Sequence, residues 1–158
     1  MGIFLNKIII TIDGPAASGK GKIAKYISKK WNYKHLDSGT LYRNLAFFLI
    51  KNKININSKD QLKKAIKRQK TISYKKYTKL RTEEISMTAS KIAVHDFIRN
   101  YINKFQRKFV KFNLKNSHFV IDGRDIGSVV FKNADLKLYI DVNEKNRAKR
   151  RYKQLIDS

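Results

Sequence analysis

Short apolar runs alternate with longer amphipathic stretches along most of the chain. Residues 8–12 form a β-branched run ending at Asp13, which is typical of a strand buried on both faces. From Gly19 to Trp31 the apolar residues recur at helical spacing, and lysines occupy most of the opposite side. A glycine-containing loop joins the two segments. The pattern therefore predicts a strand, loop and helix at the start of the domain.

The same reasoning predicts further strands and helices downstream. The expected strands are 33–36, 119–121 and 136–142, and the expected helices are 40–51, 61–70, 83–93, 96–112 and 144–156. Residues 52–60 are expected to form a connection, and 71–80 are only weakly patterned. Strands that alternate with helices favour an α/β fold with a parallel sheet flanked by helices, and a site at the carboxyl ends of the strands. A single domain spanning 1–158 is expected, because this length supports one core and no linker composition marks a boundary.

The composition restricts the possible partners and chemistry. Thirty-six Lys and Arg residues against 12 Asp and Glu give a formal net charge of +24, so a phosphate-rich substrate, a nucleic acid or simple solubility all remain open. The absence of cysteine excludes disulfides, thiolate catalysis and Cys-ligated metals. The histidines at 35, 95 and 118 form no metal-spaced pair. No signal peptide or membrane span is recognisable, so a cytoplasmic protein without a membrane partner is expected.

Residues 14–20 match the phosphate-loop pattern G-x-x-x-x-G-K, between the strongest strand and the first helix. In such a loop the backbone N–H groups surround phosphates, the helix start adds partial positive charge, and Lys20 reaches the β and γ oxygens. The expected ATP-phosphate-binding residues are Gly14, Pro15, Ala16, Ala17, Ser18, Gly19, Lys20 and Gly21. Because Gly21 replaces the usual magnesium-binding Ser or Thr, Mg²⁺ would need the phosphates, waters and a nearby carboxylate. Asp13 and Asp37 are candidates for that role through water, with turn capping as the alternative.

Taken with downstream motifs, the chain resembles the nucleoside monophosphate kinases, most closely the bacterial cytidylate kinases. The matching segments are ITIDGPAASGKG at 10–21, LDSGTLYR at 36–43, LRTEEI and TASKIA at 80–93, DGRDIGSVVF at 122–131 and RAKRRYKQL at 147–155. The resemblance implies a P-loop kinase fold and transfer of the γ-phosphoryl group of ATP to CMP or dCMP, with Mg²⁺ bound to the ATP. It also implies small-molecule nucleotides as partners, a monomer, and no obligate nucleic acid.

The resemblance also implies roles for individual residues. Ser38, Tyr42 and Arg43 would line the acceptor side, with Asp122 and Arg124 at the acceptor phosphate and sugar edge. Ser90, Arg99 and Asp125 would read the base, and the Asp125 carboxylate suits the amino group of cytosine but opposes the carbonyl of uracil. Transfer spreads negative charge over the phosphoryl oxygens, which calls for cations. The expected catalytic residues are Lys20 and the lid arginines Arg147, Arg150 and Arg151.

The chain departs from the family pattern in two places. The acceptor-binding region, about 52–95, contains a shortened insert of which 70–79 is nearly all that remains, and residues 144–158 correspond to only the start of the lid. Relatives continue through the rest of the lid and a final edge strand. One alternative is therefore a truncated kinase-fold protein with weak or no activity. Another is a basic RNA- or DNA-binding protein that retains the phosphate loop as a scaffold, with Tyr74 and Tyr77 available to stack on bases.

Overall fold

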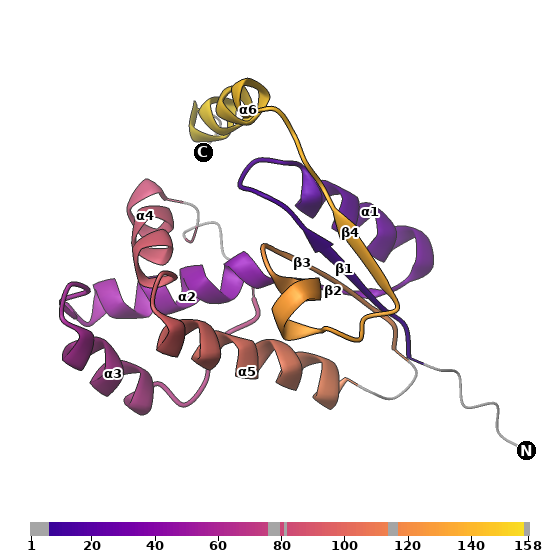
Figure 1. Cartoon of the computed structure of the whole chain (residues 1–158). Helices are drawn as coiled ribbons and strands as arrows, with labels where there is room; N and C mark the ends of the chain where they lie inside the picture. Colours follow the sequence, from indigo (N-terminus) through magenta and orange to yellow (C-terminus); the bar gives the residue numbers. More distant parts are fainter. Residues whose placement is uncertain (1–6, 76–79, 81, 114–116, 157–158) are drawn as a thin grey trace, which may run out of the picture. The chain divides into compact units, whose positions relative to one another are not determined.

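The computed structural model describes residues 7–75, 80, 82–113 and 117–156 (Figure 1). The strands are β1 (Ile9–Asp13), β2 (Lys34–Asp37), β3 (Phe119–Gly123) and β4 (Leu136–Tyr139). The helices are α1 (Lys20–Trp31), α2 (Ser38–Lys51), α3 (Lys59–Arg68), α4 (Glu83–Ile92), α5 (Asp96–Phe112) and α6 (Glu144–Ile156), and a π-helical turn, η2, spans Ile126–Val130. Each predicted strand and helix is therefore present, with shifts of a few residues at some ends.

The four strands form one parallel sheet in the order β2-β3-β1-β4. Strands β1 and β3 lie in its centre, and all five residues of β3 are buried. The predicted α/β class with a parallel sheet is confirmed. β4 ends at Tyr139, earlier than expected, because its partner β1 ends at Asp13, which pairs with Tyr139. Beyond that point, none of the described strands lies beside β4 to extend the ladder.

Helix α1 covers one face of the sheet. Ile10, Ile12 and Val120 from the sheet form a buried cluster with Ala24 and Ile27 of α1. The opposite face packs against the C-terminal part of α5, where the rings of Phe109 and Phe119 meet edge to face with centroids 6.0 Å apart. Burying apolar side chains on both faces explains why the strands read as continuous apolar runs.

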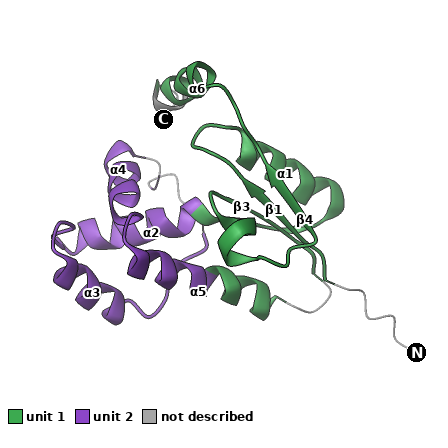
Figure 2. Cartoon of the chain, in the orientation of Figure 1, with its two compact units in different colours: residues 1–38, 106–157 green, residues 39–105, 158 purple. Residues whose placement is uncertain are grey.

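The chain divides into two compact units, comprising residues 1–38 with 106–157 and residues 39–105 with 158 (Figure 2). The second unit is built from helices: α2, α3, α4 and the first part of α5. Its fully buried side chains include Leu41, Leu45, Leu49, Leu62, Ile92, Ile98 and Ile102. Helix α3 begins at Lys59, two residues before the expected start, because the Ser58 hydroxyl caps it by accepting from the backbone N–H of Gln61.

Residues 71–75 form neither helix nor strand and lie against α2. The Asn44 side chain donates to the backbone oxygens of Ser73, at 2.9 Å, and Lys75, at 3.3 Å. The Tyr74 hydroxyl donates to the Phe105 carbonyl at 2.9 Å, whereas Tyr77 lies outside the described residues. The predicted shortened insert thus falls partly on 70–75 and partly on residues that the structure does not describe.

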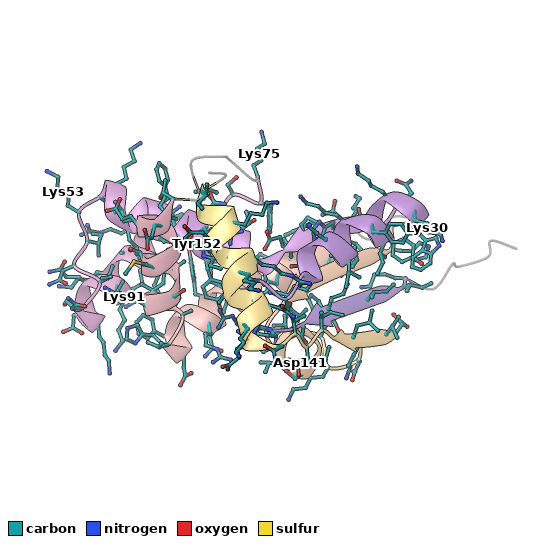
Figure 3. The ribbon with its side chains drawn as sticks, turned by 90° about the horizontal axis from the view of Figure 1, so that it is seen from above. Lys30, Lys53, Lys75, Lys91, Asp141 and Tyr152 are labelled. Carbon is teal, nitrogen blue, oxygen red and sulfur yellow. The ribbon has the colours of Figure 1, made fainter. Side chains whose placement is uncertain are left out.

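Basic side chains project from separate elements. Lys30 lies on α1, Lys53 follows α2 and Lys91 lies on α4, and all three are exposed (Figure 3). In the described ranges, no helix is both long enough and apolar enough to cross a membrane.

Candidate functional site

The phosphate loop connects the carboxyl end of β1 to the first turn of α1. Two of its glycines are required by the backbone. A Cβ at Gly14 would lie 2.4 Å from the Ile140 carbonyl oxygen, and Gly19 has a φ of +96°. Both are conditions that residues with side chains rarely satisfy. The loop therefore has the local geometry that the motif predicts, with the start of a 12-residue helix behind it.

Lys20 lies over its own loop. Its Nζ donates to the Pro15 carbonyl at 3.0 Å. Burial lowers the pKa of Lys20 below its ordinary value, and Arg124 lowers it further, while Asp122, Asp37 and Asp13 oppose the shift. Within the described ranges, no carboxylate forms a direct ion pair with this partly desolvated ammonium. A polyphosphate would provide the missing negative charge.

Asp13 ends β1 and holds the turn that follows β3. Its Oδ1 accepts from the Ile126 N–H at 2.7 Å, and its Oδ2 accepts from the Gly127 N–H at 2.8 Å. The carboxylate is buried and caps η2, which begins directly after Arg124 and Asp125. The capping role considered as the alternative for Asp13 is thus seen in the structure, whereas its metal role stays a prediction.

Four more predicted residues lie in the same unit as the loop. Ser38 is buried, and its Oγ lies close to the backbone of Gly123. A Cβ on Gly123 would lie 2.4 Å from that oxygen, so the approach requires glycine. Arg124 is exposed, and Asp125 is half-buried at the start of η2. Asp37 is half-buried at the end of β2.

Of the lid arginines, Arg150 contacts the phosphate loop. Its Nη1 donates to the Ser18 carbonyl at 3.0 Å. Arg147 instead folds back on the start of α6, where its Nε donates to the Val142 carbonyl at 3.1 Å and its Nη2 lies 3.4 Å from Glu144 Oε1. Arg151 is half-buried. The structure therefore brings one of the three arginines to the loop.

The remaining predicted residues belong to the helical unit. Tyr42 and Arg43 lie half-buried on α2, and Arg43 Nη2 donates to Thr40 Oγ1 at 3.2 Å. Arg99 is half-buried on α5. Ser90 is exposed on α4, and its hydroxyl donates to the Ser86 carbonyl at 3.0 Å, as a serine on a helix surface commonly does.

One buried polar pair was missed by the sequence analysis. His35 Nε2 and Asp122 Oδ1 lie 2.6 Å apart, and their side chains are 12% and 5% exposed. The only sequence signal was a polar residue inside the short second strand. Within the described part of the chain, no group of three or more His, Asp or Glu side chains is arranged to hold a metal ion.

The chain matches the family model described as cytidylate kinase over residues 10–158. It is similar to the cytidylate kinase of Fusobacterium nucleatum, with 36% identity over 97% of this chain and 72% of that protein. It is also similar to those of Rickettsia felis, with 41% identity over 96% and 67%, and Rickettsia africae, with 42% over 92% and 64%. This chain thus spans about two thirds of its relatives' length.

Among solved structures, TT1252 from Thermus thermophilus overlaps with a TM-score of 0.48 at 16% identity, covering 91% of this chain and 70% of that one. The family match confirms the resemblance seen in the sequence motifs and does not favour the nucleic-acid-binding alternative. The chain belongs to the cytidylate kinase family, whose enzymes are ATP-dependent nucleoside monophosphate kinases.

Proposed function

We propose that this chain transfers the γ-phosphoryl group of ATP to CMP or dCMP, yielding ADP and CDP or dCDP. The observation that carries the proposal is the phosphate loop with Lys20 above it, next to an acidic turn that Asp13 holds in place. The family match over 10–158 supports the same activity. A cytoplasmic monomer without an obligate nucleic-acid partner stays a prediction.

The donor side relies on cations and backbone N–H groups. Phosphoryl transfer needs little covalent chemistry from the protein, so positioning and charge stabilisation are its main tasks. Lys20 binds the β and γ oxygens, and the loop N–H groups surround them. Arg150 meets the transferring group in this proposal, which its bond of 3.0 Å to the Ser18 carbonyl supports. Arg147 and Arg151 join it when the helix that carries them closes on the substrates.

The acceptor-binding residues recognise the phosphate group and the base of CMP. The planar guanidinium of Arg43 donates a bidentate pair of hydrogen bonds to the CMP phosphate. Asp125 accepts from the cytosine amino group, while Arg99 and Ser90 meet the acceptors at N3 and O2. Ser38, Tyr42, Asp122 and Arg124 complete the phosphate and sugar contacts. Uracil would place a carbonyl against Asp125, which leaves two acceptors unpaired and disfavours UMP by about 1–3 kcal/mol.

The residues around Lys20 fit a magnesium ion held mainly by ATP and water. Position 21 offers no hydroxyl, and a Cβ there would lie 3.6 Å from Asp122 Oδ2. Asp37 ends β2 and, like Asp13, raises the pKa of Lys20, so these two carboxylates are the ones that would act on the ion through water. When bound, the ion neutralises charge on the β- and γ-phosphates.

Coupled ADP release with CMP, dCMP, UMP and AMP as separate acceptors tests the function. Release confined to the cytidine pair is the expected result. The matched control is Lys20→Ala, which lacks the ammonium and should show no acceptor-dependent release. Equal release with all four acceptors, or none with any, would refute the proposal.

A further inference from the structure

His35 on β2 and Asp122 near the end of β3 form a nearly buried pair. Strand β2 pairs with β3 so that Asp37 lies opposite Asp122 and His35 lies opposite Val120. Because side chains alternate along a strand, His35 and Asp122 point to the same face of the sheet, the face covered by α1. The distance of 2.6 Å between Nε2 and Oδ1 makes the histidine the donor to a carboxylate that is almost inaccessible to water.

The second oxygen of Asp122 faces the start of α1. A Cβ at Gly21 would lie 3.6 Å from Oδ2, and Lys20 is the adjacent residue. Among the charged groups that act on Lys20, Asp122 has the largest effect on its pKa, which it raises. Yet the Lys20 ammonium donates to Pro15, and the ion pair that the described residues give Asp122 is with His35. Asp122 therefore acts on Lys20 at a distance without binding it.

A buried carboxylate that loses its donor must find another, because an unpaired buried charge is strongly unfavourable. The Lys20 ammonium is a candidate, because Asp122 already acts on it and Oδ2 lies near the adjacent Gly21. A direct pair between Lys20 and Asp122 would satisfy both groups, but it would also draw the ammonium away from the loop. The lysine would then have to break that pair before it could bind phosphate.

We propose that His35 is a positioning residue for ATP binding: by donating to Asp122 it keeps that carboxylate from pairing with Lys20, and so leaves the ammonium over the loop. This role rests on the proposed function, since it assumes that Lys20 binds the phosphates of ATP. It also accounts for a histidine within β2 whose Nε2 contacts Oδ1 of Asp122, while Oδ2 is the oxygen near Gly21.

Calorimetric titration with ATP tests this role in three single variants. His35→Leu removes the donor and should weaken ATP binding about tenfold or more, the range expected for a hydrogen bond to a charged group. His35→Gln keeps an N–H donor and should stay within about threefold of the wild type. The matched control is His118→Gln, since His118 accepts from the Ile8 N–H at the opposite end of the sheet and should leave ATP affinity within about twofold. Should His35→Leu not fold, His35→Phe fills the ring's volume without a donor and gives the same comparison.

A double variant separates this role from general support of the fold. In His35→Leu/Asp122→Asn the competing carboxylate is gone, so ATP affinity should recover most of the loss seen in His35→Leu. NMR titration should show the pKa of Lys20 raised in His35→Leu relative to the wild type. Wild-type ATP affinity in His35→Leu, equal losses in His35→Leu and His35→Gln, or no recovery in the double variant would each overturn the role of His35.

These outcomes are distinguishable from a failure of the proposed function. A wild-type chain that follows this ATP-binding pattern but phosphorylates no nucleotide would refute cytidylate kinase activity and leave the role of His35 standing. A chain that phosphorylates CMP while His35→Leu binds ATP normally would refute the role of His35 alone.

Discussion

Replacing Asp13 by Asn tests whether this carboxylate ties the phosphate loop to the acceptor turn. The carboxylate accepts two backbone N–H groups, at 2.7 Å from Ile126 and 2.8 Å from Gly127, and the side chain is buried. Asparagine has a single acceptor oxygen, so one bond survives in neutral form and the amide NH₂ faces the other N–H. Asparagine and aspartate have nearly the same size, so the substitution changes the hydrogen bonding and the charge alone.

The cost follows from those two bonds. A hydrogen bond to a charged group contributes about 1.5–3 kcal/mol, and a neutral one contributes about 1 kcal/mol. Losing one charged bond and weakening the other should lower the free energy of unfolding by about 3 kcal/mol. This is a large part of the roughly 5–15 kcal/mol that stabilises a typical domain. Because η2 follows Arg124 and Asp125 directly, the KM for CMP should also rise more than the KM for ATP.

Urea-induced unfolding, followed by circular dichroism, measures the change. The matched control is Asp141→Asn, since Asp141 is exposed and its bond among the described residues is with the N–H of its neighbour Val142, so a loss below about 0.5 kcal/mol is expected. A loss below about 1 kcal/mol in Asp13→Asn would contradict the assignment of two strong bonds to this carboxylate.

Other residues give further predictions. Lys20→Ala should abolish phosphoryl transfer. It should change the free energy of unfolding by less than about 1 kcal/mol, because the partial burial of the ammonium makes it a weak contributor to stability. Near-normal turnover in a steady-state assay would remove Lys20 from the mechanism. Arg99→Ala and Asp125→Asn should each lower the ratio of CMP to UMP turnover more than they weaken ATP binding, and an unchanged ratio would exclude both from base recognition. Tyr101 donates to the Gln69 carbonyl, and burial raises its pKa from 10.0 to about 12, so the folded state holds this proton more tightly than the unfolded state does. The free energy of unfolding should therefore fall as the pH rises from about 10 to about 12, and Tyr101→Phe should flatten that fall in alkaline urea titrations, whereas an unchanged slope would contradict the shift.

The secondary structure was predictable because its signals are local. The β-branched run at 8–12 and the stripe carrying Ala24 and Ile27 depend only on neighbours in the sequence, and both elements appear where expected. The ends of a strand were less predictable where a neighbouring strand determines them. β4 ends at Tyr139 because β1 ends opposite it, and that pairing joins residues far apart in the chain.

The site was predictable in its motif and not in its internal bonds. The spacing of Gly14, Gly19 and Lys20 determines the loop, so the loop was identified from the sequence alone. The capping bonds of Asp13 and the pair of His35 with Asp122 depend on how parallel strands align side by side. Composition and periodicity contain no information on that register, so neither contact could be derived before the sheet was known.

Transfer of label from [γ-³²P]ATP, with the products separated by chromatography, tests the central claim most directly. With CMP and Mg²⁺ present, the account predicts that the full chain places the label in CDP and that Lys20→Ala does not. Label that appears only as inorganic phosphate, or that stays in ATP at every CMP concentration, would contradict the assignment of this chain as an active cytidylate kinase.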